Sequence, residues 1–212
     1  MRVIGYASPA FTWVEYDLAG MSLQDRLRFL WRNPPRIRFT KDWQLTIIED
    51  SGRRVKLVFP MGFVTDCASV PRLFWLIPGF SPFGALRPGS LPHDMGYQYG
   101  YLLVRAEDWV PLPTEMQFYL DHRERFGEYR PVYVGRVQKF FDKMMKSIVN
   151  QVSHATVSAA VAYGILRGFG KRAWNKYRRQ GPGAYGDNSL DLPGTGELDS
   201  RAVLLAKFSA EF

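Results

Sequence analysis

The sequence predicts an α+β fold: a small antiparallel β-sheet or hairpin followed by a helical core, with an extended N-terminal arm and an extended C-terminal tail. The 212-residue chain is 46% hydrophobic and 15% aromatic, which is enough for a packed core. Two strand-like segments flank Asp50-Ser51-Gly52, and long helical patterns follow residue 135. We therefore expect an arm with a short helix over residues 1–35, one domain over 36–180, and a tail over 181–212.

Charge and cysteine content limit the partners and the cellular compartment that we expect for the protein. The net charge of +8 favours an acidic partner such as nucleic acid, anionic membrane or an acidic protein, although a basic surface alone also explains it. Cys67 is the only cysteine, which excludes an intramolecular disulfide. The N-terminus lacks the apolar run of a signal peptide, so we expect synthesis in a cytoplasm. No uninterrupted apolar run predicts a transmembrane segment.

The first elements are a short helix and a hairpin. Ser22 can cap a helix whose third residue is Asp25, and Asn33-Pro34-Pro35 ends it. Residues 44–48 and 54–59 then read as strands joined by the turn at Asp50-Ser51-Gly52. In the loop that follows, the short polar side chains of Asp66 and Ser69 could hydrogen-bond their own backbone or lean into a site, and Thr65 belongs to the same motif.

A loop rich in proline and glycine leads to a helix expected over residues 93–103. Pro92 suits a helix start, because the first helical N–H has no partner within the helix. On that helix His93 and Tyr97 are one turn apart and share a face, and Asp94 lies beside His93. Residues 104–135 are expected to be an irregular insertion with a short helix over 114–126, long enough to suggest function or partner contact.

Two further helices are expected over residues 135–152 and 153–169, the second ending at Gly168-Phe169-Gly170. A basic patch follows, and aromatic residues alternate with its cations; the cations are Lys171, Arg172, Lys176, Arg178 and Arg179. Such a patch could touch nucleic acid, but an acidic protein neighbour explains it equally well, so nucleic acid is not favoured. Residues 181–212 are rich in glycine and proline and read as a tail that a partner would order.

Several of these motifs together resemble an uncharacterised family, domain of unknown function 1353, which is common in tailed bacteriophages and prophages. The resemblance covers roughly residues 55–175. It rests on Phe63-Val64-Thr65-Asp66 with Ala68-Ser69-Val70-Pro71, on His93-Asp94 with Tyr97, on Arg136 with Asp142, and on Tyr163 with Arg167-Gly168-Phe169-Gly170. Two departures are the intervening residues 104–135 and Phe141-Asp142 in place of the family's Ala-Asp pair. The resemblance implies a phage origin and little about chemistry. A virion role would place the protein in the particle after synthesis in the host cytoplasm.

A more distant likeness is to phospholipases of the A-two type, which place a His-Asp pair on one helix and a second aspartate on another. The likeness implies His93 as general base, Asp142 as the residue that orients it, Tyr97 as a supporting donor and Asp94 as a calcium ligand. A histidine oriented by a carboxylate can take a proton from water. The glycine-rich calcium loop and the disulfides of those enzymes are missing here, so Ca²⁺ is expected only under this interpretation.

Two functions follow from these observations. The favoured one is a structural or accessory component of a tailed-phage virion, in its tail or neck region, that docks to other virion proteins through its terminal arms and needs no cofactor. The alternative is a hydrolase that acts on lipid or cell envelope during entry or lysis. They differ in the role of His93 and Asp94, which form either a buried polar network between helices or a catalytic site.

Overall fold

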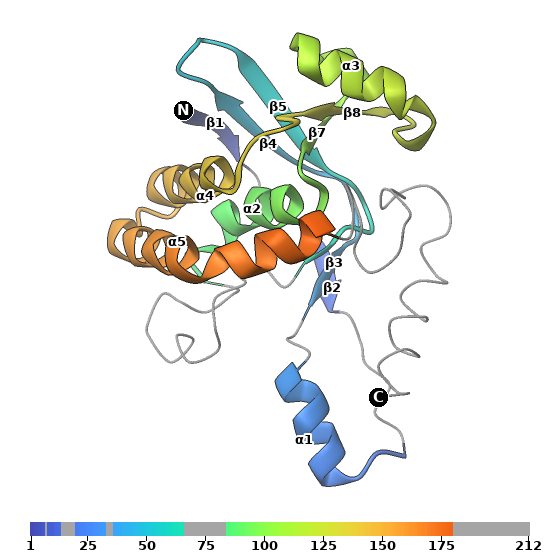
Figure 1. Ribbon diagram of the computed structural model, residues 1–212. Coiled ribbons are helices and arrows are strands. Elements are labelled where there is room, and N and C mark those ends of the chain that lie inside the picture. The colour runs from blue at the N-terminus through green and yellow to red at the C-terminus, as the bar shows by residue number, and fades with distance from the viewer. Residues whose placement is uncertain (7, 14–19, 33–35, 66–83, 180–212) are drawn as a thin grey trace.

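The computed structural model describes residues 1–6, 8–13, 20–32, 36–65 and 84–179, and it has the predicted α+β fold (Figure 1). The described helices are α1 (Leu23–Arg32), α2 (Arg87–Tyr99), α3 (Pro113–Asp121), α4 (Gln138–Val152) and α5 (Thr156–Arg179), with 3₁₀ turns at Ala106–Asp108 and Arg123–Arg125. The described strands are β1 (Arg2–Tyr6), β2 (Phe11–Trp13), β3 (Ile37–Phe39), β4 (Trp43–Ile48), β5 (Arg54–Phe59), β6 (Val64–Thr65), β7 (Leu102–Arg105) and β8 (Tyr129–Val132).

The strands form an antiparallel five-stranded sheet in the order β1-β4-β5-β7-β8 and a small sheet in the order β2-β3-β6. The predicted hairpin of β4 and β5 is confirmed, with Leu45 opposite Leu57 and Ile47 opposite Val55. Alternate residues of β4 are buried, as expected for a strand with one face on the core. Gly52 closes the turn with φ of 86°, a conformation that favours glycine.

The chain segments expected to be an arm and an insertion contribute strands to the main sheet. Residues 2–6 form edge strand β1 on β4, and residues 129–132 form the opposite edge strand β8. The short helix expected over residues 114–126 is confirmed as α3, but the prediction that the rest of 104–135 is irregular was wrong, because this stretch holds the end of β7 and all of β8. Pro131 argued against a strand, but an edge strand tolerates proline because one side of it has no ladder partner.

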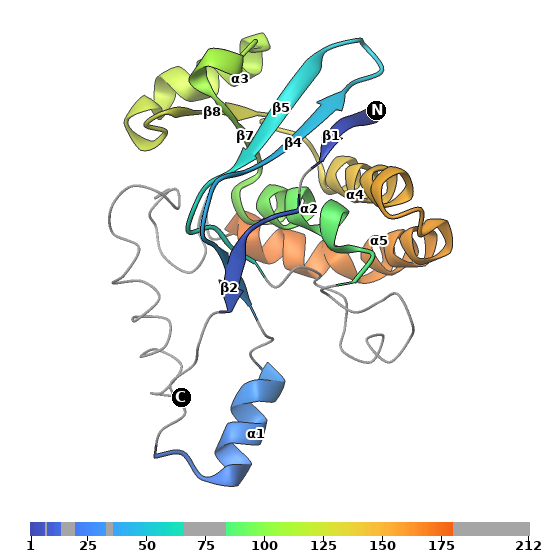
Figure 2. The ribbon, with the colours of Figure 1, turned by 180° about the vertical axis from the view of Figure 1, so that it is seen from behind.

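Helix α2 is the central helix of the fold, and every residue from Pro88 to Tyr99 is buried. Figures 1 and 2 show it between the sheet and the hairpin of α4 and α5. It begins at Arg87, six residues before His93, so the prediction of a start at Pro92 was wrong. Pro92 lies inside the helix at a typical cost of about 3 kcal/mol. Packing on all sides offsets that cost, which is why the local signal failed.

Helix α5 continues through Gly168 and Gly170 to Arg179, so the expected end at residues 168–170 was also wrong. A Cβ atom at Gly170 would lie 2.8 Å from the Tyr97 hydroxyl and 2.9 Å from Gln138 Nε2. This glycine therefore permits close approach of α5 to α2 and α4. The predicted capping of α1 is confirmed, since Ser22 Oγ accepts a hydrogen bond from the Asp25 N–H at 3.2 Å. Residues 181–212 lie outside the described residues.

Candidate functional site

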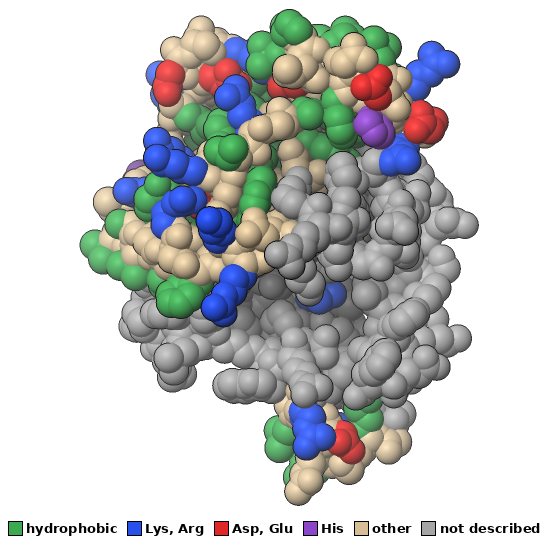
Figure 3. Space-filling model, in the orientation of Figure 1, with side chains coloured by type: hydrophobic (Ala, Val, Ile, Leu, Met, Phe, Trp, Pro, Cys, Tyr) green, Lys and Arg blue, Asp and Glu red, His purple; other side chains and the backbone are tan. Residues whose placement is uncertain are grey.

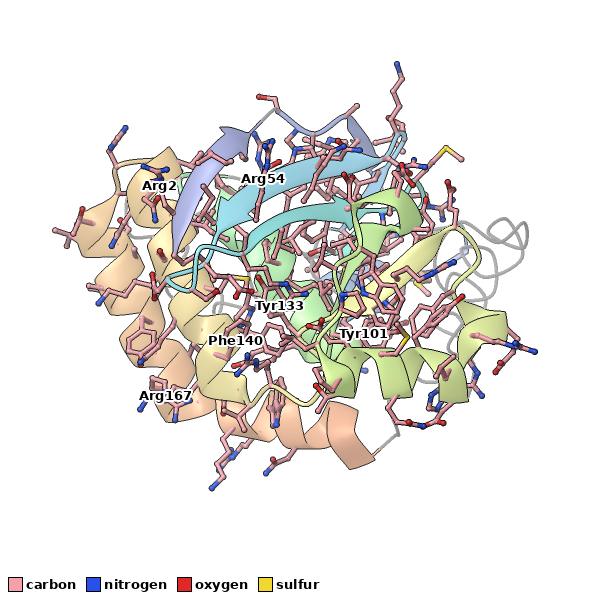
Figure 4. The ribbon with its side chains drawn as sticks, turned by 90° about the horizontal axis from the view of Figure 1, so that it is seen from above. Arg2, Arg54, Tyr101, Tyr133, Phe140 and Arg167 are labelled. Atoms are coloured by element: carbon pink, nitrogen blue, oxygen red, sulfur yellow. The ribbon has the colours of Figure 1, made fainter. Side chains whose placement is uncertain are left out.

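A polar cluster lies where α2, α4 and α5 meet. Helix α2 contributes His93, Asp94 and Tyr97, α4 contributes Asp142, and α5 contributes Arg167. The three ionisable groups at its centre are almost completely enclosed, with exposed fractions of 2% for His93, 3% for Asp94 and 0% for Asp142. The Arg167 side chain is 39% exposed, and Figure 4 shows it on α5 at the edge of the helical layer.

His93 lies between two carboxylates that approach opposite nitrogens of its ring. Its Nδ1 is 3.3 Å from Asp94 Oδ1, and its Nε2 is 3.2 Å from Asp142 Oδ1. Both nitrogens carry hydrogen only in the imidazolium form, which can then donate to both carboxylates. The Tyr97 ring packs on the imidazole with 4.0 Å between ring centroids, which helps to hold its orientation.

Asp142 is the residue that joins the three helices. Its Oδ1 accepts hydrogen bonds from the Tyr97 hydroxyl at 2.7 Å and from His93, and its Oδ2 accepts one from Arg167 at 3.1 Å. Each oxygen of this fully buried carboxylate is therefore satisfied, as a buried charge requires.

Asp94 ties the cluster to the small sheet. Its Oδ2 accepts a hydrogen bond from the hydroxyl of Thr65 on β6, and its Oδ1 faces His93. The imidazole ring separates Asp94 from Asp142, so the two carboxylates do not face a common point. Among the described residues no group of three histidine, cysteine or acidic side chains is arranged to hold a metal ion. The role of Asp94 as a calcium ligand stays a prediction of the phospholipase likeness.

Close packing of α2 on α4 holds the helices at the distance that the cluster needs. A Cβ atom at Gly96 would lie 2.2 Å from the Phe141 ring, and one at Gly89 would lie 2.4 Å from the Met145 carbonyl oxygen. Both contacts are far shorter than van der Waals separation, so only glycine fits. The Phe141-Asp142 pair, which departs from the family's Ala-Asp pair, thus places a ring and a carboxylate of α4 against α2.

The charges of the cluster balance one another. Burial alone would lower the pKa of His93, but hydrogen bonds and charge from Asp142 and Asp94 outweigh it and raise the pKa to about 9. Burial alone would raise the pKa of Asp142, but hydrogen bonds from His93, Tyr97 and Arg167 lower it. Burial and the Asp142 charge raise the pKa of Tyr97. At neutral pH an imidazolium therefore lies between two carboxylates.

This arrangement is well suited to holding helices together and poorly suited to base catalysis. A general base must be neutral and within reach of the proton that it removes. His93 is charged at neutral pH, and both of its nitrogens face carboxylates. A fully satisfied buried network instead favours one arrangement of the surrounding core.

The structure brings together most of the residues that the sequence motifs singled out. Thr65 and Arg167 contact the two aspartates of the cluster. Arg136, expected to accompany Asp142, is instead exposed and lies 5.2 Å from the Phe140 ring centroid. Asp66 and Ser69 lie outside the described residues. Lys171 and Arg172 are exposed on α5, and the backbone of Lys176, Arg178 and Arg179 continues that helix.

Sequence reasoning missed a second buried ionic group, centred on Glu115 of α3. Glu115 is 1% exposed, and its Oε2 accepts from Arg53 at 2.8 Å and from the Leu112 N–H at 2.8 Å. Its Oε1 accepts from the N–H of Tyr133, whose ring lies against Phe140 (Figure 4). Pro113 at the helix start with Glu115 two residues later was an available capping signal. Arg53, the ion-pair partner of Glu115, could not be identified from neighbouring sequence because 62 positions separate the two residues.

Comparisons with known proteins give one family and no individual relative. A family model described as "Protein of unknown function (DUF1353)" matches residues 43–164. No curated protein and no solved structure matches the chain. In the described part of the chain, no helix has the length and apolar character needed to cross a membrane.

Proposed function

The chain belongs to DUF1353, a family of proteins of unknown function, and we propose that it is a structural or accessory component of a tailed-bacteriophage virion. In this proposal the protein is a rigid domain, part of the tail or neck region, that docks to other virion proteins through its terminal segments. The protein is made in the host cytoplasm and ends in the particle.

The observation that carries the non-enzymatic role is the enclosure of His93 between Asp94 and Asp142. The imidazole is 2% exposed, and each of its nitrogens is within 3.3 Å of a carboxylate oxygen. A histidine held in this way links α2 to α4 and offers neither a free lone pair nor access for substrate. The cluster then serves to fix the domain that a neighbouring protein would recognise.

The assignment to a phage particle is supported by the motif resemblance and by the composition of residues 181–212. A glycine- and proline-rich segment buries little surface alone, and such segments can wrap a large surface on a partner.

The test is whether the chain is incorporated into particles. We expect the full-length chain to co-purify with particles of the phage or prophage that encodes it, and a chain lacking residues 181–212 to remain outside them. Mass spectrometry of gradient-purified particles measures the incorporation of both chains. The control is Lys41→Gln, a substitution at an exposed position, which should be incorporated normally. Absence of the intact chain from purified particles would contradict the virion role. Normal incorporation of the truncated chain would contradict anchoring by that segment.

The second candidate is a hydrolase acting on lipid or cell envelope. The observation that favours it is the meeting of His93, Tyr97 and Asp142, which are hydrogen-bonded at Asp142 Oδ1. For His93 to act as a base, it must lose its proton, which requires a pH near or above about 9. Hydrolysis of phospholipid vesicles or cell-wall fragments that rises toward that pH and disappears in His93→Gln would establish this candidate. Absence of hydrolysis across pH 6 to 10 by the folded wild-type protein would dismiss it.

A further inference from the structure

Helices α4 and α5 carry an unusually one-sided distribution of charge. From Gln138 to Arg179 the sequence has nine Lys and Arg residues and one acidic residue, Asp142. Asp142 is fully buried and already bonded to Arg167 and His93, so it neutralises none of the lysines at the surface. In Figure 3 many Lys and Arg side chains gather over these two helices.

The lysines of α4 lie on one stripe of that helix. Lys139, Lys143 and Lys146 are spaced by four and three residues, so they follow one another along one face over about 10 Å at 1.5 Å per residue. Lys139 and Lys143 are exposed, and Lys146 is half-buried. The stripe lies beside the buried face that carries Asp142 and Val149.

Contacts between the two helices show that cations of α5 lie beside this lysine stripe of α4. Lys146 Nζ lies 5.3 Å from the Tyr163 ring centroid, and Arg167 reaches Asp142. About one turn of α5 beyond Arg167, Gly170 lies against Gln138 of α4. The next residues of the two helices, Lys171 and Lys139, are therefore at the same height along the helix pair. We call the five cations along this line the basic seam: Lys139, Lys143, Lys146, Arg167 and Lys171. Among the described residues, Lys139, Lys143 and Lys171 have no ion-pair partner.

We propose that the basic seam binds the phosphate backbone of double-stranded DNA without sequence preference. Duplex DNA carries about one negative charge per 1.7 Å of helix axis, so it can neutralise a row of closely spaced cations. Lysine makes phosphate contacts readily, whereas protein–protein interfaces are depleted of lysine and enriched in aromatic residues and arginine. The excess of lysine in the seam therefore favours nucleic acid over an acidic protein. This inference does not depend on the virion role.

The test is the salt dependence of binding to a short fluorescein-labelled duplex, measured by fluorescence anisotropy with the full chain. The seam variant is Lys139→Gln/Lys143→Gln/Lys171→Gln, which spares Lys146 and Arg167 and their contacts. The matched control is Arg2→Gln/Lys41→Gln/Arg54→Gln, which removes the same charge from exposed positions. Figure 4 shows Arg2 and Arg54 with the sheet and Arg167 on α5.

We expect the wild-type chain to bind the duplex at about 50 mM salt, with an affinity that falls as salt rises. The slope of log affinity against log salt should decrease in magnitude by about 2 to 3 in the seam variant and by less than about 1 in the control. No binding by the wild-type chain at low salt, or equal losses in the two variants, would overturn the proposal. So would seam-dependent binding to polyglutamate or to phosphatidylserine vesicles without binding to the duplex.

Single charge reversals provide a second test that depends less on folding. Lys143→Glu should weaken duplex binding more than Lys41→Glu does, with unchanged far-UV circular dichroism in both. Equal weakening by the two reversals would overturn the assignment of the site to the seam.

Discussion

His93 Nε2 of α2 lies 3.2 Å from Asp142 Oδ1 of α4, although 49 positions separate the two residues in the chain. This contact, with Tyr97 and Arg167 on the same carboxylate, connects three helices through one buried group. Its energetic consequences can be measured without knowing the biological role of the protein.

Asp142→Asn should lower the free energy of unfolding by about 3 kcal/mol. The amide keeps the shape of the side chain but removes the charge that compensates His93 and Arg167, and breaking a buried ion pair typically costs this amount. Urea denaturation at pH 7 followed by circular dichroism measures it. Asp121→Asn, at an exposed position of α3, is the control and should change stability by less than about 0.5 kcal/mol. Equal effects of the two changes would mean that the charge of Asp142 does not stabilise the fold by compensating His93 and Arg167.

Stability should decline as pH rises from about 6.5 to about 9. The pKa of His93 is raised from 6.5 to about 9, so its stabilising contribution is complete below about 6.5 and is lost as pH rises through about 9. The difference between about 9 and 6.5, at 1.36 kcal/mol per pH unit, corresponds to roughly 3 kcal/mol. Denaturation across this range should show a decline in the wild-type chain that His93→Gln largely removes. A decline of the same size in His93→Gln would assign it to other groups.

At acidic pH the dependence should have the opposite sign. The pKa of Asp142 is lowered from its ordinary value of 3.8, so its contribution is present above that value and is lost as pH falls through the lowered pKa. Acid denaturation of the wild-type chain should therefore include a component below about pH 3.8 that is absent from Asp142→Asn. If the difference between the two proteins stays constant from pH 5 to pH 2, this linkage is refuted.

Tyr97→Phe should destabilise the protein by about 1.5 to 3 kcal/mol, the usual range for a hydrogen bond to a charged group. The change removes the hydroxyl that donates to Asp142 but keeps the ring that packs on His93 and Trp174. Thermal unfolding of wild type, Tyr97→Phe and Tyr163→Phe measures the effect, and the half-buried Tyr163 serves as a comparison. A loss no larger than that of Tyr163→Phe would argue against the hydrogen bond.

Gly96→Ala and Gly164→Ala should change stability in opposite directions. The new methyl group at Gly96 would meet the buried Phe141 ring at 2.2 Å, and overpacking of a core typically costs about 1 to 3 kcal/mol. At Gly164, on an exposed turn of α5, nothing lies within 4 Å, so alanine should stabilise the helix by about 0.5 to 1 kcal/mol. Urea denaturation of both variants tests the pair, and similar signs would contradict the close approach of α2 and α4.

Local sequence signals succeeded where the deciding interactions are themselves local. The β4–β5 hairpin follows from alternation around Gly52, and the start of α1 follows from Ser22 and Asp25. The same signals failed for Pro92, Pro131 and Gly170. At Pro92 and Gly170 long-range packing overrides the local preference, and at Pro131 an edge position removes the penalty.

The sequence by itself determined the α+β class, the excess of positive charge in the last helices, and the identity of the groups that could meet His93. Tertiary structure alone decided that these groups are enclosed, that Arg167 and not Arg136 reaches Asp142, and that the lysines of α4 and the cations of α5 share one seam. The physical reason is that burial and charge pairing depend on neighbours far away in the chain. The protonation state of His93 follows from those neighbours.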